Sequence, residues 1–306
     1  MSITMKAKPY ISLIIILSVL FVSCNQSDQN EQIDTPVSGK DTVYVEDILL
    51  PYFSAAKPRY DSVFEHADIT LISVNARRGM SLLFADSANC VILSRDYLQD
   101  EDSIRSALKL PFKQIEIAKD GLVFFVNTSI PIDTLNIMQL QDFVNGSSIN
   151  TVQKLTTLDE RLIIPSMQSS EYAALLHYFS IKDKPLPIKT TIMEDRKQLK
   201  KHILSNNAIA IGMMSDVLKD SSVKPIRIGY VDSSKRRIPP QIVHPGFIVQ
   251  NMYPLIVPIF AYMKNDKQNL AWGFATFMEK DPEVQRILLK QGIVPTHARY
   301  NLIRED

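Results

Sequence analysis

The chain has 306 residues, of which 45% are hydrophobic and 22% are charged, and its 34 lysines and arginines balance 33 aspartates and glutamates. Such a balance argues against a nucleic-acid-binding or polybasic surface protein. Its two cysteines, Cys24 and Cys90, are too few for a disulfide framework.

The N-terminal residues carry the pattern of a secretory signal. Two lysines precede an apolar run, residues 11–22, which is followed by Ser23 and Cys24. A run of about a dozen residues is shorter than the roughly 20 that cross a bilayer as a helix, so we expect it to be removed. The segment before Cys24 resembles a bacterial lipobox, although Phe21 is unusual there. The resemblance implies a signal peptide over residues 1–23 and lipid attachment to Cys24; an ordinary signal peptide that contains a cysteine is the alternative.

The segment that follows is polar. Residues 24–40 are rich in Gln, Asn, Ser and Asp and hold almost nothing that could enter a core, which predicts a flexible tether. The remainder, residues 41–306, is long enough for one large domain or two ordinary ones. Cys90 lies in an apolar, strand-like run, so we expect it to be a buried free thiol.

Short apolar runs alternate with segments of helical periodicity along this remainder. The strand-like runs are residues 69–74, 90–93, 122–126, 162–164, 208–213 and 258–262. The helix-like stretches are residues 137–144, 170–179, 270–278 and 284–290. Strands separated by helices predict an α/β fold with parallel sheets.

Several short segments occur in an order that resembles the phosphate-binding proteins of bacterial ABC importers. Residues 118–127 look like the strand that leaves the family's first lobe, and residues 135–146 are similar to the helix and glycine that follow it. Residues 253–262 look like the returning strand. Residues 274–295 resemble the family's terminal helix and its Gly-Tyr-Val-Pro ending. The order of these segments, more than any one of them, carries the resemblance.

The resemblance implies a two-lobed, periplasmic-binding-protein-like (type II) α/β fold with a ligand cleft between the lobes. One lobe is expected to comprise residues 41–119 and 246–306, and the other residues 120–245. A small oxyanion, phosphate first, is the implied ligand, and an ABC permease is an implied partner. Helix N-termini suit such a ligand because their unpaired N–H groups and positive dipole ends attract anions.

One candidate for the anion site follows the strand-like run at residues 90–93. Ser94 and Arg95 stand where the family commonly has a Ser-Arg pair. An arginine can hold an oxyanion through two parallel hydrogen bonds. The alternative for Arg95 is a surface ion pair with Asp96 or Asp100.

A second candidate is the pair Ser169 and Ser170, at the place of the family's Ser-Gly-Thr turn. These serines precede a helix-like stretch, so their hydroxyl groups could meet an anion at the helix N-terminus. As plain N-caps they need no ligand, and this alternative stays open.

The loop that precedes the first helix departs from the family. Where the family offers hydroxyl groups, this chain has Glu46 and Asp47, and carboxylates at that place repel an incoming anion. Arg77 or Arg78 is a candidate to neutralise these acids or to clamp the anion, and the arginine pair is equally consistent with a solvated helix start. Phosphate is therefore expected to bind weakly or not at all unless the acids are neutralised.

Enzyme signatures are absent from the sequence. It contains no Gly-x-Ser-x-Gly nucleophile turn, no Gly-x-Gly-x-x-Gly and no P-loop. The five histidines show no i, i+4 pairing and no cysteine partner, so neither a zinc site nor a cofactor is expected. The basic stretch at residues 196–201 is interpreted as a solvated helix face.

These observations predict a monomeric, lipid-anchored lipoprotein of the bacterial cell envelope that is not an enzyme and binds a small oxyanion. Its soluble domain is expected in the periplasm or at the cell surface. The alternative is a non-transport envelope protein that uses a degenerate binding-protein fold as an interaction or sensing module. A closed, hydroxyl-lined cleft favours the first hypothesis, and a plugged cleft with an exposed apolar patch favours the second. An enzyme with an unrecognised site is a third and weaker hypothesis.

Overall fold

The computed structural model of the protein describes residues 35–146, 162–181, 186, 188–264 and 268–297. The expected signal peptide, Cys24 and most of the expected tether lie outside these residues. No helix within the described ranges is long and apolar enough to span a membrane.

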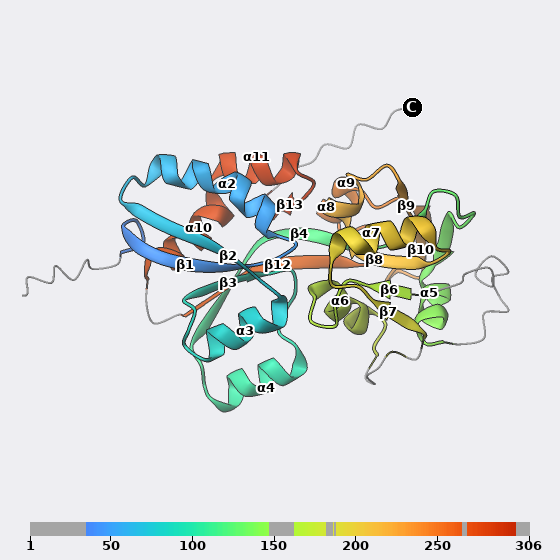
Figure 1. Cartoon of the computed structure of the whole chain (residues 1–306), viewed down its shortest axis with the longest axis horizontal. Helices are drawn as coiled ribbons and strands as arrows, with labels where there is room; N and C mark the ends of the chain where they lie inside the picture. Colours follow the sequence, from blue (N-terminus) through green and yellow to red (C-terminus); the bar gives the residue numbers. More distant parts are fainter. Residues whose placement is uncertain (1–34, 147–161, 182–185, 187, 265–267, 298–306) are drawn as a thin grey trace, which may run out of the picture. The chain divides into compact units, whose positions relative to one another are not determined.

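The first lobe is centred on three parallel strands: β1 (Gly39–Glu46), β2 (Ala67–Val74) and β3 (Cys90–Leu93). On one side of these strands lie α2 (Leu50–Val63), α10 (Leu270–Lys280) and α11 (Pro282–Lys290), and on the other side lie α3 (Ala76–Phe84) and α4 (Gln99–Ala107) (Figure 1). Because β1 begins at Gly39, the last two residues of the expected tether belong to the first strand.

The second lobe is centred on three further parallel strands: β6 (Leu162–Ile164), β7 (Thr190–Ile192) and β8 (Ile209–Met213). The helices of this lobe are α5 (Ile137–Val144) and α6 (Ser170–Tyr178) on one side, and α7 (Arg196–Ser205), α8 (Met214–Val217) and α9 (Pro245–Val249) on the other (Figure 1). A small sheet beside them contains β5 (Thr134–Asn136), β10 (Arg227–Val231) and β11 (Arg237–Gln241).

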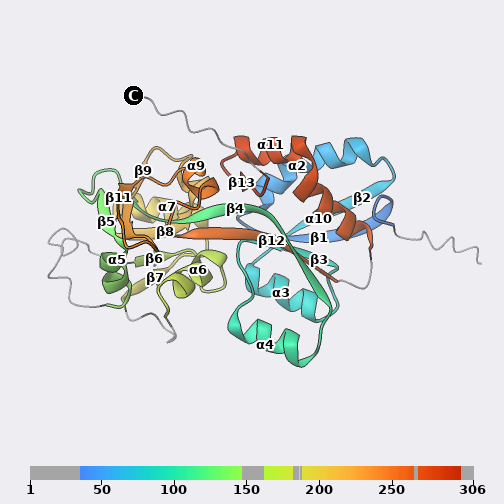
Figure 2. The same ribbon diagram turned by 180° about the vertical axis from the view of Figure 1, so that it is seen from behind.

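Two long antiparallel strands run from one lobe into the other: β4 (Phe112–Asn127) and β12 (Ile256–Lys264) (Figure 2). β4 pairs with β12 up to Gly121 and with β8 from Leu122 onward. β12 also pairs with β3, which gives the strand order β2-β1-β3-β12-β4-β8-β6-β7. Two short strands, β9 (Val223–Pro225) and β13 (Val294–Pro295), complete the pairing of β4.

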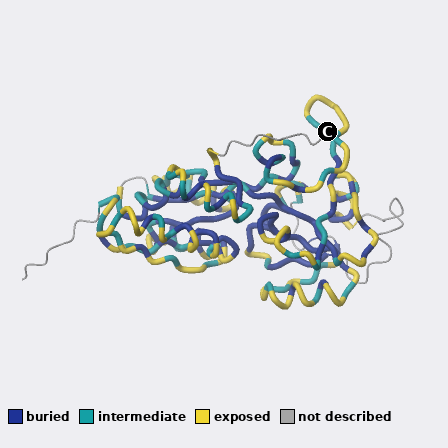
Figure 3. Tube along the Cα trace, turned by 90° about the horizontal axis from the view of Figure 1, so that it is seen from above, coloured by how far each residue is buried: buried dark blue, intermediate teal, exposed yellow. Residues whose placement is uncertain are grey.

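The core follows the central strands, where buried residues are concentrated (Figure 3). Every residue of β3 and of β8 is buried. Such strands lack a polar alternation because helices cover both faces of the sheet, as in parallel α/β structures. Cys90 is a buried free thiol, as the sequence predicts.

The expected two-lobed α/β architecture is confirmed. The expectation of parallel strands is correct for the centre of each lobe and wrong for β4 and β12, which run antiparallel. The expected helices at residues 137–144, 170–179, 270–278 and 284–290 correspond to α5, α6, α10 and α11. β1 was not among the predicted strands, because only its last residues before Glu46, Val43 to Val45, form an apolar run.

Candidate functional site

A buried carboxylate lies where the two lobes meet. Glu46, the last residue of β1, is 0% exposed and accepts three hydrogen bonds. The backbone N–H of Ser94 donates to Oε2 over 2.8 Å, and the backbone N–H of Ser170 donates to Oε1 over 3.0 Å. The Ser170 hydroxyl donates to Oε2 over 2.7 Å. One carboxylate from the first lobe is therefore held by donors from both lobes.

These donors converge because of where the strands end and where α6 begins. Glu46 is the last residue of β1, and Ser94 directly follows β3. Because these two strands are paired and parallel, both residues lie at the same end of the sheet. Ser170 is the first residue of α6, and the first N–H groups of a helix have no partner within it. Ser169 caps this helix with its hydroxyl oxygen. The carboxylate of Glu46 thus occupies an anion-binding helix N-terminus of the opposite lobe.

Three carboxylates at this site share one nearby guanidinium group. Glu171 is 0% exposed and its Oε1 lies 2.8 Å from Nη2 of Arg196, while Oδ1 of Asp47 lies 3.7 Å from the same nitrogen. Burial raises the pKa of Glu46, and repulsion from Glu171 raises it further. Burial also raises the pKa of Asp47, although the attraction of Arg196 opposes it. The negative charge here exceeds the positive charge, which favours protonation of these acids.

The two arginines that the sequence offers as anion ligands lie in a cluster of their own. Arg95 is 4% exposed and holds Glu101 through two hydrogen bonds of 2.6 and 2.8 Å. Arg77 donates to Glu101 over 2.7 Å and also pairs with Asp100. Burial pushes the pKa of Glu101 upward, but the hydrogen bonds and charge of Arg95 outweigh it, and the pKa is lowered. Both guanidinium groups are thus engaged by carboxylates of α4.

Two expectations about these arginines are wrong. Arg95 is not a surface residue that pairs with the carboxylate of Asp96 or Asp100, because the first turn of α4 brings Glu101 against it. Arg77 pairs with acids of α4 and not with Glu46 or Asp47. The cation beside Asp47 is Arg196, from a stretch that was interpreted as a solvated helix face.

The site therefore divides the predicted residues into two groups. Glu46, Ser94 and Ser170 come together, with Ser169 beside them as a helix cap and Asp47 next to Arg196. Arg77 and Arg95 gather around Glu101 instead. Sequence reasoning missed Glu171 and Arg196. The only sequence signal for Glu171 is an acid in the first turn of a helix, which is common without any ligand.

A second buried carboxylate lies on β4, next to the residue where this strand changes partner. Asp120 is 0% exposed and accepts hydrogen bonds from the backbone N–H groups of Gly121, over 2.7 Å, and Ser215, over 3.2 Å. The Ser215 hydroxyl donates to it over 2.5 Å. Burial raises the pKa of Asp120 to about 7, although these hydrogen bonds oppose the rise. Asp120 therefore titrates in the neutral range at the crossing between the lobes.

Anion recognition is the chemistry that this arrangement can perform. Backbone N–H groups and hydroxyl groups converge on one point, where they can hold oxygen atoms that carry negative charge. Within the described part of the chain, no group of His, Cys, Asp and Glu residues is arranged to hold a metal ion.

Comparisons with known proteins agree with this geometry at the level of the fold. A family model described as the PBP superfamily domain matches residues 30–281. A substrate-binding protein with bound phosphate from Clostridium perfringens is similar in structure, with a TM-score of 0.67 and 17% identity, over 84% of this chain and 99% of that chain. An ABC-type phosphate transport receptor from Vibrio cholerae has a TM-score of 0.64 and 17% identity, over 84% of this chain and 100% of that chain. PstS from Borrelia burgdorferi has a TM-score of 0.54 and 16% identity, over 84% of this chain and 99% of that chain. No curated protein matches the chain.

Proposed function

Because the chain belongs to the PBP superfamily, we propose that it is an envelope binding protein whose interlobe cleft takes a small oxyanion, phosphate first, in competition with its own Glu46. The observation that carries this proposal is the set of three donors on Glu46, since two backbone N–H groups and a hydroxyl suit an oxyanion equally well. The buried hydroxyl of Ser94 has no hydrogen-bond partner among the described residues. It is available as a fourth donor for an anion with more oxygen atoms than a carboxylate.

Glu46 is expected to prevail over phosphate at neutral pH. It is attached to the chain, so its effective concentration at the donors is fixed and high. Asp47 and Glu171 lie close by and repel a second anion. Protonation of Glu46 removes one negative charge and weakens its hydrogen bonds, and burial makes this protonation easier. We therefore expect phosphate to bind the unmodified protein weakly or not at all, and relatively better as Glu46 gains its proton.

Calorimetric titration of variants with phosphate, sulfate and molybdate tests this proposal. Glu46→Ser removes the competitor, and Glu46→Ser combined with Asp47→Thr also removes a repulsive charge. At least one oxyanion is expected to bind the double variant tenfold or more tightly than the unmodified protein. Glu65→Ser is the matched control, because it removes an exposed acid of the first lobe. Tight phosphate binding by the unmodified protein, lost in the double variant, would instead identify the acids as ligand contacts.

A second candidate function is a non-transport interaction or sensing module, and one observation favours it. The hydrogen bonds between Glu46 and Ser170 join the two lobes through a carboxylate that belongs to the chain itself. If neither Glu46→Ser nor the double variant binds any of the three anions while both remain folded, this candidate replaces the first.

Attachment to a membrane is proposed from the sequence. Residues 1–23 would be cleaved as a signal peptide, and lipid on Cys24 would hold the protein at the envelope through the tether at residues 24–40. Cys24→Ser is expected to yield an exported chain that no longer sediments with membranes. Retention of this variant after a carbonate wash rules the lipid anchor out. An ABC permease as partner, and a monomeric state, belong to the same proposal.

We also propose that residues 41–119 and 246–306 form one lobe and residues 120–245 the other, except that α9 (Pro245–Val249), at this boundary, lies beside the second lobe (Figure 1). The change of partner along β4, from β12 to β8 next to Gly121, supports this division. Residues 120–245 expressed alone are expected to unfold cooperatively in urea. A fragment that shows no cooperative transition contradicts the boundaries.

A further inference from the structure

The segment that leads into the first strand is fastened to the first lobe. Residues Thr35–Ser38, here called the strap, form a turn in which the backbone N–H of Thr35 donates to the carbonyl oxygen of Ser38 over 3.0 Å. The hydroxyl groups of the same two residues are hydrogen-bonded over 2.7 Å. Gly39 follows with a φ of 122°, which glycine adopts readily, and its N–H donates to the carbonyl oxygen of His66 over 2.9 Å. The strap therefore has a defined conformation up to the point where β1 begins.

A glycine of α10 makes room for the strap. A Cβ atom at position 273 would lie 1.7 Å from the carbonyl oxygen of Pro36 and 2.6 Å from its carbonyl carbon, so only glycine allows this approach. Gly273 lies within α10, where glycine is less favourable than alanine because it loses more backbone freedom on folding. The glycine is accounted for by the backbone contact that it permits. Pro36 is thus held directly against a helix of the first lobe.

We propose that the strap fixes the end of the first lobe at which β1 and β2 begin toward a lipid bilayer, which is the partner of that end. This inference rests on the lipid anchor at Cys24 proposed above. Because the strap belongs to the fold, the chain between the lipid and the fold shortens to residues 25–34, which span at most about 35 Å when fully extended. The point where the chain enters the fold is fixed by the strap, so the start of β1 stays within this distance of the bilayer.

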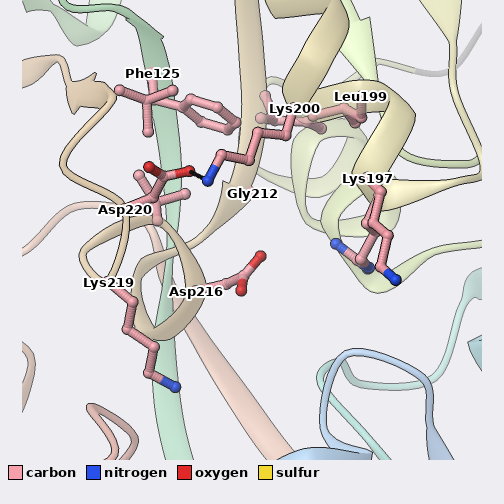
Figure 4. Close-up of a pocket in the computed structure, with 12 residues that line it drawn as sticks. Phe125, Lys197, Leu199, Lys200, Gly212, Asp216, Lys219 and Asp220 are labelled. Atoms are coloured by element: carbon pink, nitrogen blue, oxygen red, sulfur yellow. Dashed lines mark ion pairs between the residues drawn. The ribbon is translucent and has the colours of Figure 1, made fainter.

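The opposite end of the described molecule belongs to the second lobe. β10 and β11 lie there, far from the start of β1 (Figure 1, Figure 2). The second lobe also contains a pocket of about 370 Å³ between α7 and α8, in which Lys200 pairs with Asp220 over 2.7 Å (Figure 4). With the first lobe held at the bilayer, the hairpin of β10 and β11 and this pocket face away from the lipid.

Amide hydrogen exchange on the soluble Cys24→Ser protein tests the strap without lipid. Gly273→Ala is expected to push Pro36 off α10, so that the amides of Thr35 and Gly39 exchange at least tenfold faster. The midpoint of thermal unfolding is expected to fall, although alanine favours a helix more than glycine does. Unchanged exchange at both amides overturns the proposal.

Gly79→Ala is the matched control. Gly79 also lies inside a helix of the first lobe, α3, but a Cβ atom there would meet the side chains of Val91 and Val74 instead of the strap. This variant is expected to leave exchange at Thr35 and Gly39 within twofold of the unmodified protein. Equal acceleration in both glycine variants would show that general packing, and not the contact with α10, protects the strap, which overturns the proposal.

Energy transfer on liposomes tests the orientation. The lipidated protein is placed in vesicles of phosphatidylethanolamine and phosphatidylglycerol that carry an acceptor lipid, with a donor dye at Glu65→Cys or at Ser233→Cys. Glu65 is exposed just before β2 and Ser233 is exposed between β10 and β11, whereas Cys90 is buried. Transfer from position 65 is expected to exceed that from position 233 at least twofold, and Gly273→Ala is expected to reduce the difference.

Two outcomes on vesicles overturn the orientation: equal transfer from the two positions, or stronger transfer from position 233. Retention of Cys24→Ser at the membrane would remove the anchor on which the orientation rests. Exchange at Gly39 distinguishes that failure from a failure of the strap, because it is measured without lipid.

Discussion

Glu46 and Glu101 are glutamates of the first lobe at 0% and 3% exposure, and they differ in their hydrogen-bond donors and in the charges that surround them. Glu101 faces the guanidinium groups of Arg95 and Arg77, whereas Glu46 receives its hydrogen bonds from backbone N–H groups and a hydroxyl. Burial raises the pKa of Glu46, but the arginines lower that of Glu101 in spite of burial. Neutral donors therefore do not offset the cost of burying the Glu46 carboxylate beside other acids, whereas cations offset that cost at Glu101.

The largest loss of stability is expected from removing Arg95, the buried cation that pairs with Glu101. Arg95→Met leaves a buried carboxylate without its main partner and is expected to lower the free energy of unfolding by about 3 to 5 kcal/mol. Urea denaturation measures the difference. Arg105→Met is the control, because Arg105 forms an exposed pair with Asp102 whose loss is expected to cost at most about 1 kcal/mol. Equal losses in the two variants would contradict the role of burial.

Asp120 extends the comparison, since its three hydrogen bonds also come from neutral groups. Its folded pKa of about 7 exceeds the ordinary aspartate pKa of 3.8, so the folded state binds the proton more tightly than the unfolded state. This contribution to stability is complete below about pH 4 and declines as the pH rises to 7, by roughly 4 kcal/mol at most. Asp120→Asn is expected to remove this decline, which unfolding measured from pH 4 to pH 8 would reveal. Identical pH profiles for the variant and the unmodified protein would show that Asp120 does not titrate there.

The opposite dependence is expected from Glu101. Its lowered pKa contributes stability that is present above about pH 4.5 and lost as the pH falls through the folded pKa. Acidification below about pH 4.5 should therefore weaken the Glu101 cluster. Protonation of Glu46, whose pKa is raised, relieves the repulsion at that site and begins at a higher pH.

A smaller effect is expected at the start of α6. Ser170→Ala removes a hydroxyl that donates to the Glu46 carboxylate and is expected to cost roughly 1.5 to 3 kcal/mol. Ser169→Ala removes only the helix cap, at about 1 kcal/mol. Thermal and urea unfolding of both variants show which of them loses more stability. A larger loss for Ser169→Ala would mean that the contact with Glu46 stabilises the protein little.

The smallest effect is expected at Arg77. This side chain is 35% exposed, and Arg95 still holds Glu101 when Arg77 is removed. Arg77→Met should therefore cost about 1 kcal/mol or less. A double-mutant cycle with Asp100→Asn measures the pair directly, and a coupling energy as large as the loss in Arg95→Met would erase the distinction between the two arginines.

The sequence predicts the fold and part of the site because local patterns determine them. The apolar runs that become β3 and β8, and the caps of α10 and α11, are readable from neighbouring residues. Ser94 and Ser170 could be predicted as site residues, because Ser94 follows an apolar strand-like run and Ser170 lies at the start of a helix-like stretch. The partner of Glu46 could not be predicted, because Ser170 lies 124 positions away and belongs to the other lobe. Arg196 was missed for the same reason, since its acidic partners lie on other elements.

The position of β12 has a consequence for the order in which the chain assembles. β12 lies between β3 and β4, yet it begins at Ile256, long after β4 ends at Asn127. Until that late segment emerges, one edge of β3 and one edge of β4 have no strand to pair with, and unpaired edges invite aggregation. The second lobe draws its central strands from a continuous stretch of chain and is free to form earlier. The lobe that begins first in the sequence is therefore expected to be completed last during folding.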